Sequence, residues 1–87
     1  MKTLEVTADV YSNTEGIAYR MYIDDCLMTE RTFRWEPRKK YVEEHMVIQV
    51  PKGSTHRVRV ESCKGGNYFT LRNVTVDGVN SNETFTV

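Results

Sequence analysis

Two histidines and two cysteines are the side chains of this 87-residue sequence best suited to metal or nucleophilic chemistry. His45, His56 and Cys63, with Glu43, could in principle bind zinc, but neither a Cys-x-x-Cys nor a His-x-x-x-His pair is present. We therefore expect a solvent-facing His45 and a His56 at the core edge, hydrogen-bonded to the backbone. The spacing of Cys26 and Cys63 does not imply a bridge, so we predict two free thiols.

Three aspartates fall where the chain is expected to turn. Asp24 and Asp25 occupy the apex of a predicted hairpin, and Asp77 precedes Gly78. Carboxylates at turns are hard oxygen ligands that suit calcium. Aspartate is also common at turns for its backbone preference alone. We favour the turn role and predict no metal and no other cofactor, although calcium remains an open alternative.

Tyrosines at strand ends and polar-facing positions are the best candidates for direct binding. Such residues are Tyr11, Tyr22, Tyr41 and Tyr68, and a phenol there can stack on a sugar ring or hydrogen-bond across an interface. Among them, Tyr22 and Tyr68 are the predicted binding residues. A half-buried structural tyrosine at the edge of a sheet is the alternative.

A basic connector is the second candidate for binding. Residues 31–40 carry five basic and one acidic side chain, a net charge of +4, whereas residues 1–30 carry two basic and six acidic ones, a net charge of −4. Within this stretch the connector itself is Glu36–Lys40, and Arg38, Lys39 and Lys40 are its predicted binding residues. Because the whole chain is neutral, we expect a solvated loop or a contact with an acidic protein surface, and no nucleic-acid binding.

Catalysis is not expected. The sequence has no Gly-x-Ser-x-Gly motif and no glycine-rich phosphate loop. A domain of this size also buries only about 60–65% of its unfolded surface, so a deep cleft competes with the core for residues. We predict a non-enzymatic module.

Alternation of apolar and polar residues dominates the chain. It is clear in Thr3–Tyr11, Ile17–Asp24 and Thr55–Ser62, and turn signals recur every 8–12 residues. Residues 68–77 change phase near Arg72 and Asn73, which predicts a bulge. The pattern predicts one all-β domain over residues 1–87, an antiparallel two-layer β-sandwich of about seven strands.

The inward parity of these strands predicts the core. Its expected members are Leu4, Val6, Val10, Ile23, Leu27, Phe33, Trp35, Ile48, Val58, Val60, Leu71, Val76 and Phe85. Glu44 interrupts the apolar face of residues 41–50.

No segment of the sequence predicts a membrane span or a secretory signal. The amino-terminal residues lack a run of seven apolar side chains, and no stretch approaches the eighteen needed to cross a bilayer. We expect a chain that stays in the cytoplasm where it is made and does not bind membranes.

Three segments carry a family resemblance: YRMYIDDCLMTERTFRW, HRVRVESC and NYFTLRNVTVDG. Together they resemble the jelly-roll β-sandwich modules of carbohydrate-binding proteins, and they look similar to the small free-standing β-sandwich proteins of tailed-phage virions. The resemblance covers roughly residues 17–78. It departs from the pattern at Asp25 and Cys26, which replace the usual apex glycine, and it lacks a cluster of exposed tryptophans.

The resemblance implies a jelly-roll-like structural or binding module. We expect a phage virion accessory protein, a capsid decoration or tail component, that acts through contacts with a protein lattice or with copies of itself. The alternative is a carbohydrate-binding module that uses its surface tyrosines to bind a glycan.

Overall fold

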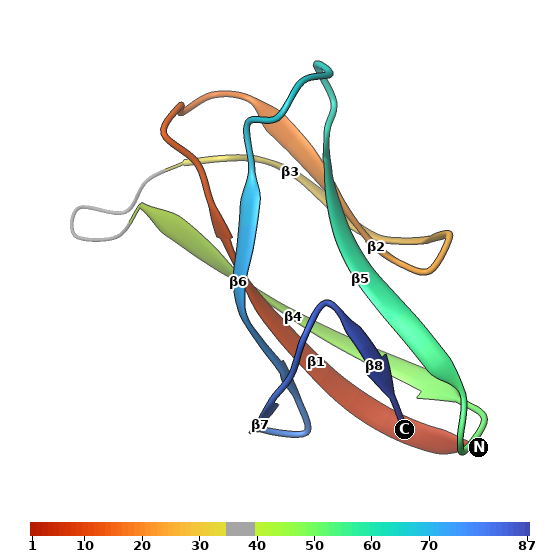
Figure 1. Cartoon of the computed structure of the whole chain (residues 1–87). Coiled ribbons are helices and arrows are strands. Elements are labelled where there is room, and N and C mark those ends of the chain that lie inside the picture. Colours follow the sequence, from red (N-terminus) through yellow and green to blue (C-terminus); the bar gives the residue numbers. More distant parts are fainter. Residues whose placement is uncertain (35–39) are drawn as a thin grey trace.

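The computed structural model describes residues 1–34 and 40–87, and within these ranges every regular element is a β-strand. The strands form two antiparallel four-stranded sheets that pack face to face (Figure 1). The first sheet has the order β4 (Tyr41–Val50), β1 (Lys2–Tyr11), β6 (Thr70–Val76), β7 (Val79–Asn80). The second has the order β3 (Cys26–Thr32), β2 (Ala18–Ile23), β5 (Thr55–Ser62), β8 (Thr84–Thr86). The predicted β-sandwich is confirmed.

Strand β1 shows how the sequence pattern becomes a core. Leu4, Val6, Ala8 and Val10 are fully buried, as their shared parity requires. The strand pairs with β4 along its whole length without a register shift, and with β6 on its other side. A central strand with one apolar face therefore anchors the first sheet.

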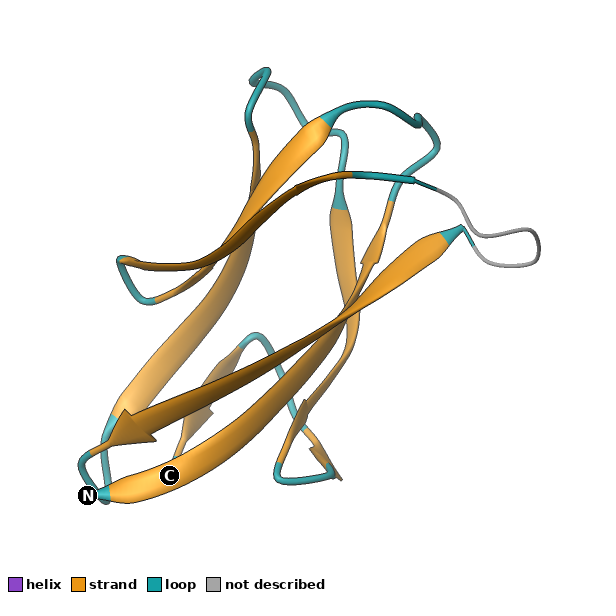
Figure 2. Cartoon of the chain, turned by 180° about the vertical axis from the view of Figure 1, so that it is seen from behind, coloured by secondary structure: helices purple, strands orange, loops and turns teal. Residues whose placement is uncertain are grey.

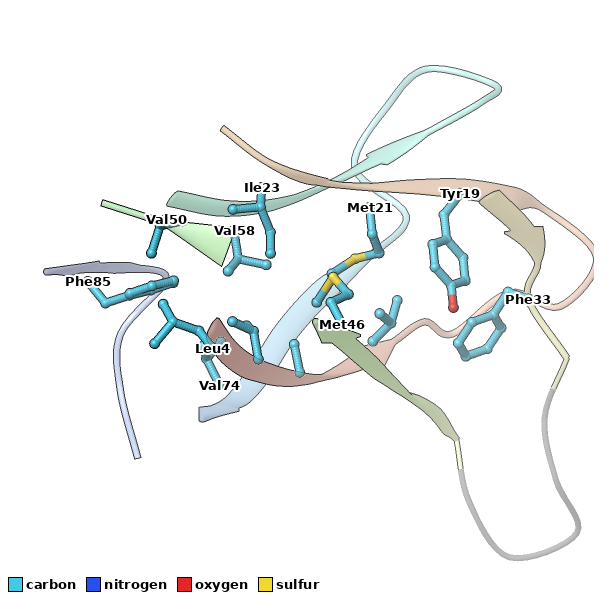
Figure 3. Packing of buried hydrophobic residues seen from close by; sticks show 13 residues of the cluster. Leu4, Tyr19, Met21, Ile23, Phe33, Met46, Val50, Val58, Val74 and Phe85 are labelled. Carbon is cyan, nitrogen blue, oxygen red and sulfur yellow. The ribbon is translucent and has the colours of Figure 1, made fainter. Parts of the chain in front are cut away.

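The core lies between the two sheets (Figure 3). Its buried members are Leu4, Val6, Ala8, Val10, Tyr19, Met21, Ile23, Phe33, Met46, Val50, Val58, Val74 and Phe85. Tyr19 and Phe33 pack at one end of this core, and Leu4 and Phe85 pack at the other (Figure 3). The first end also holds Phe69, whose ring centroid is 5.1 Å from that of Tyr19 and 5.7 Å from that of Phe33.

Most of the predicted core is buried or packed against it. The fully confirmed members are Leu4, Val6, Val10, Ile23, Phe33, Val58 and Phe85. Those that are partly buried against the core are Ile48, Val60, Leu71 and Val76. Trp35 lies outside the described residues.

Leu27 was predicted in the core and is instead 49% exposed. A register shift between Met21 and Tyr22 is the reason, because it places Leu27 opposite the outward-facing Tyr22. Met28 packs against the core in this part of β3. The same shift leaves Arg31 opposite the buried Tyr19, so Arg31 takes an inward position on β3.

The predicted turns and bulge are present. Asp24 has φ 56°, and the Asp77-Gly78 turn has φ 51° and 81°, values that aspartate and glycine tolerate better than most residues. The register of β1 with β6 shifts between Thr7 and Asp9, and Asn73, at φ 54°, lies in the extra segment. The change of phase in the sequence therefore marks a real β-bulge.

The edge strands on the two sides of the sandwich differ in length. On one side, the edge strands β7 and β8 have two and three residues. On the other, β3 and β4 have seven and ten residues, and both lie on the near side in Figure 2. The chain ends lie together at one end of the sandwich, where Thr55 pairs with Thr86 and Lys2 with Val50 (Figure 2).

Candidate functional site

A shallow depression opens at the end of the sandwich remote from the chain termini. It lies where β1 ends, where β4 and β6 begin and beside the β5–β6 loop, segments that meet in the upper part of Figure 1. Its volume is about 430 Å³. Its lining includes Tyr11, Asn13, Lys40, Asn67, Tyr68 and Arg72. The lining therefore combines phenols, amides and two cations.

Cross-strand pairing builds one wall of this depression. Tyr11 and Tyr41 are register partners on β1 and β4, and their rings stack with centroids 4.9 Å apart and planes 28° from parallel. The guanidinium carbon of Arg72, on β6, lies 4.9 Å from the centroid of the Tyr11 ring. This cation–π contact positions Arg72 at the rim.

Tyr68 belongs to the β5–β6 loop and lines the depression from there. Its side chain is among the exposed large hydrophobics of the molecule, at 39% exposure. Gly66, at φ 77°, lies against the ring, because a Cβ there would come within 3.2 Å of a ring carbon. A glycine at this position thus permits both the loop conformation and the close approach of the phenol.

The predicted binding residues divide between two places. Tyr68 and Lys40 line the depression together. Tyr22 lies near the far end of β2, where the guanidinium carbon of Arg59 is 4.1 Å from its ring centroid. Arg38 and Lys39, the other predicted residues, lie outside the described residues. The structure therefore does not bring Tyr22 and Tyr68 into one surface.

An ion pair between a half-exposed arginine and a buried carboxylate joins the two sheets along the β3–β4 side. Arg31 Nη2 lies 2.8 Å from Glu44 Oε1, and the Glu44 side chain is only 3% exposed. The apparent break in the apolar face of β4 is thus an inward carboxylate with a cationic partner. Among the described residues, Glu44 Oε2 and the hydroxyl of Tyr19 have no hydrogen-bond partner.

Burial controls the ionisation of this cluster. Desolvation raises the pKa of Glu44 despite the opposing attraction of Arg31. Desolvation also raises the pKa of Tyr19, and the nearby Glu44 carboxylate adds to that shift. The phenol and the carboxylate therefore interact within this cluster, and each affects the pKa of the other.

A second polar cluster lies at the end that carries the chain termini. His56 Nδ1 is 2.7 Å from Asp24 Oδ2, and His56 Nε2 is 2.6 Å from Ser54 Oγ. Asp24 Oδ1 also accepts a hydrogen bond from the backbone N–H of Arg57. The hydrogen bond from His56 is the main cause of a lowered pKa at Asp24. The hydrogen-bond partners of His56 are therefore side chains, and the prediction of backbone partners is wrong. His45 is exposed, as predicted.

The order serine, histidine, aspartate invites comparison with a nucleophilic triad. The Ser54 hydroxyl, however, donates its hydrogen bond to the carbonyl oxygen of Pro51. Since the Ser54 proton is directed to a backbone carbonyl, it is not directed to His56 Nε2, and the hydrogen bond from nucleophile to base that a triad needs is not formed. The arrangement instead ties the β2–β3 turn to the β4–β5 turn.

No family model, curated protein or solved structure matches this chain. Its function must therefore be argued from its own surfaces.

The remaining candidates for chemistry are dispersed. Asp77 Oδ1 accepts a hydrogen bond from the backbone N–H of Glu5, while Asp24 binds His56, so two of the turn aspartates serve separate turns. Within residues 1–34 and 40–87, no three histidine, cysteine or carboxylate side chains lie close enough to hold a metal ion. Cys26 and Cys63 are free and exposed. The same ranges contain no helix that could span a membrane.

Sequence reasoning named Tyr11 and Tyr41 as candidate tyrosines but missed Arg72 and the way in which these three residues meet. Tyr11, Tyr41 and Arg72 are far apart in the chain, and only the alignment of β4, β1 and β6 brings them together. The signal that could have found them is the pairing of strand ends. Tyr11 ends its strand and Tyr41 begins another, so an antiparallel pair would place them opposite each other.

Proposed function

We propose that this chain is a non-enzymatic assembly module that pairs the open edge of β4 with β4 of a second copy. The observation that carries the proposal is the edge itself, ten residues long and without a bulge in its pairing with β1. Exposed edges of this length are templates for strand addition unless charge, proline or a bulge blocks them.

The direction of the backbone groups follows from the neighbouring strands. Glu5 accepts a backbone hydrogen bond from Asp77, so the peptide groups of Glu5 point toward β6 and those of Leu4 and Val6 toward β4. Their partners Ile48 and Met46 consequently point back toward β1. The intervening residues of β4 direct their N–H and C=O groups away from the sheet: Glu43, His45, Val47 and Gln49.

The side chains of these outward-directed residues permit self-pairing. A two-fold axis at Met46 places His45 opposite Val47 and Glu43 opposite Gln49 of the second copy. Like charges that face each other directly across a strand pair destabilise it. This arrangement places no like charges opposite each other. Val47, 58% exposed, gains apolar contact in the pairing.

Proline at position 47 tests this interface. Val47→Pro removes an N–H that the β1–β4 ladder does not use, so it blocks the edge and leaves the sheet paired. Val47→Thr is the matched control, because it keeps the N–H and the branched shape. Sedimentation velocity should show a dimer for the parent and for Val47→Thr, and a monomer for Val47→Pro with unchanged circular dichroism. A parent that stays monomeric up to millimolar concentration would contradict the proposal.

The setting in which such assembly would act remains a proposal from the family resemblance. A phage virion accessory protein, in the capsid or tail, needs contacts with a repeating protein lattice, and an exposed strand edge suits that need.

Carbohydrate binding is a second candidate function, favoured by the position of Tyr68. An exposed phenol in a depression that also holds Asn67 and Arg72 can stack on a sugar ring while amides and cations bind its polar groups. Tyr22 fits this role less well, because the guanidinium of Arg59 lies over its ring. A glycan screen of the parent and of Tyr68→Ala tests this function, which predicts sugar binding that the substitution abolishes.

A further inference from the structure

We propose that the depression between Tyr11 and Tyr68 binds an acidic oligosaccharide, in which Arg72 pairs with a uronate carboxylate and Tyr68 stacks on a sugar ring. This inference rests on the second candidate function and adds the charge of the ligand.

The charge of the lining carries the first step. Lys40 and Arg72 both line the depression, and among the described residues that line it none is a carboxylate. The whole chain is electrically neutral, whereas residues 31–40, which include Lys40, carry a net charge of +4. A neutral glycan offers Arg72 no counterion, whereas the carboxylate of an acidic glycan pairs with it.

The interactions of Arg72 are the second observation that supports an acidic ligand. Its register partner on β1 is Asp9, which is nearly buried and accepts a hydrogen bond of 2.9 Å from Asn73 Nδ2. Within the described parts of the chain, Arg72 makes no ion pair with Asp9 or with any other carboxylate. Its guanidinium is instead held at the Tyr11 ring. An arginine positioned by an aromatic ring presents its donors in the fixed fork that matches a carboxylate.

A second arginine–tyrosine pair in the molecule differs from this one, because its arginine makes an ion pair with a protein carboxylate. The guanidinium of Arg59 lies over the ring of Tyr22, as that of Arg72 lies over Tyr11. Arg59 Nη1, however, is 2.9 Å from Glu61 Oε2, so its charge is already neutralised. The two pairs share the same geometry and differ in whether a protein carboxylate occupies the arginine.

Titration calorimetry with two defined sugars tests the proposal. The probes are a tetrasaccharide of galacturonate and the neutral tetrasaccharide of galactose, each titrated into the parent chain. We expect the parent to bind the galacturonate probe at least about tenfold more tightly, because a charge-assisted bond is worth roughly 1.5–3 kcal/mol. That preference should weaken as salt rises.

Matched variants locate the binding. Arg72→Gln should abolish the preference for galacturonate, and Tyr68→Ala should remove the binding of both sugars. Arg59→Gln is the control and should bind like the parent. Neither arginine substitution removes core volume, and circular dichroism checks that each variant folds.

Three results would overturn the inference in different ways. Equal binding of both sugars would leave carbohydrate binding standing and refute only the acidic preference. Binding of neither sugar would refute the inference, and a broad glycan screen without hits would refute the second function with it. A loss in Arg59→Gln as large as that in Arg72→Gln would show general charge attraction and no defined site.

Discussion

The two buried polar clusters, one at each end of the core, are held in different ways. At the end with the chain termini, both ring nitrogens of His56 have side-chain partners, and the network ties two turns together. Toward the other end, Glu44 depends on a single cation from the opposite sheet and keeps one oxygen without a partner among the described residues. The difference shows that the fully partnered His56 cluster holds two neighbouring turns together, whereas the Glu44 cluster depends on how the two sheets pack against each other.

The largest effect should come from the packing around the less satisfied cluster. Phe33 is fully buried beside Tyr19 and Phe69, so Phe33→Ala should lower the free energy of unfolding by about 3–5 kcal/mol. Phe85→Ala, at the other end and on a three-residue edge strand, is the matched comparison and should cost less. Urea unfolding measures both. A larger loss in Phe85→Ala would reverse the proposed ranking of the two ends.

Removing one partner of the ion pair should have the next largest effect. Arg31→Met leaves the buried carboxylate of Glu44 unpaired and should cost about 1–3 kcal/mol, below the range for fully buried pairs because Arg31 is half exposed. Glu44→Gln removes the desolvated charge itself and should change stability by less than about 1 kcal/mol. Equal losses in the two variants would show that the pair contributes through its shape and not through its charge.

The pH dependence of the same variants sharpens this comparison. Since burial raises the pKa of Glu44, the folded state takes up a proton at a higher pH than the unfolded state. The resulting destabilisation is full above the raised folded pKa and disappears as pH falls to the ordinary value near 4.5. Unfolding of the parent from pH 7 to about pH 5 should therefore show a gain in stability that Glu44→Gln lacks.

Breaking the partnered cluster should cost less than breaking the ion pair through Arg31→Met. His56→Gln breaks the links to Asp24 and Ser54 and should cost about 1–2 kcal/mol near neutral pH. The lowered pKa of Asp24 contributes stability that is present above its unfolded value near 3.8 and is lost as pH falls through the lower folded value. That acid-dependent part should be under about 1 kcal/mol, because the Asp24 side chain is half exposed. If acid titrations of the parent and of His56→Gln ran parallel, Asp24 would not depend on His56.

Local pattern in the sequence determined much of this fold. Alternation in β1 predicted its buried face, the Asp24-Asp25 and Asp77-Gly78 turns were found where expected, and the change of phase near Asn73 marked a bulge. These features depend on residues that are neighbours in the chain, because side-chain direction in a strand and backbone conformation in a turn are set locally. The predicted sandwich followed from adding such elements together.

Contacts between distant segments were decided only by the tertiary structure. The shift between Met21 and Tyr22 turned Leu27 outward, because parity cannot reveal where a paired strand slips. The links of Arg31 to Glu44, of His56 to Asp24 and of Arg72 to Tyr11 each join residues on different strands or turns. Residue types and spacing cannot specify such pairs, since they arise from strand order and from which sheet edges face each other. The sequence thus determined which side chains point inward along most strands, and the packing of the sheets decided which of them meet.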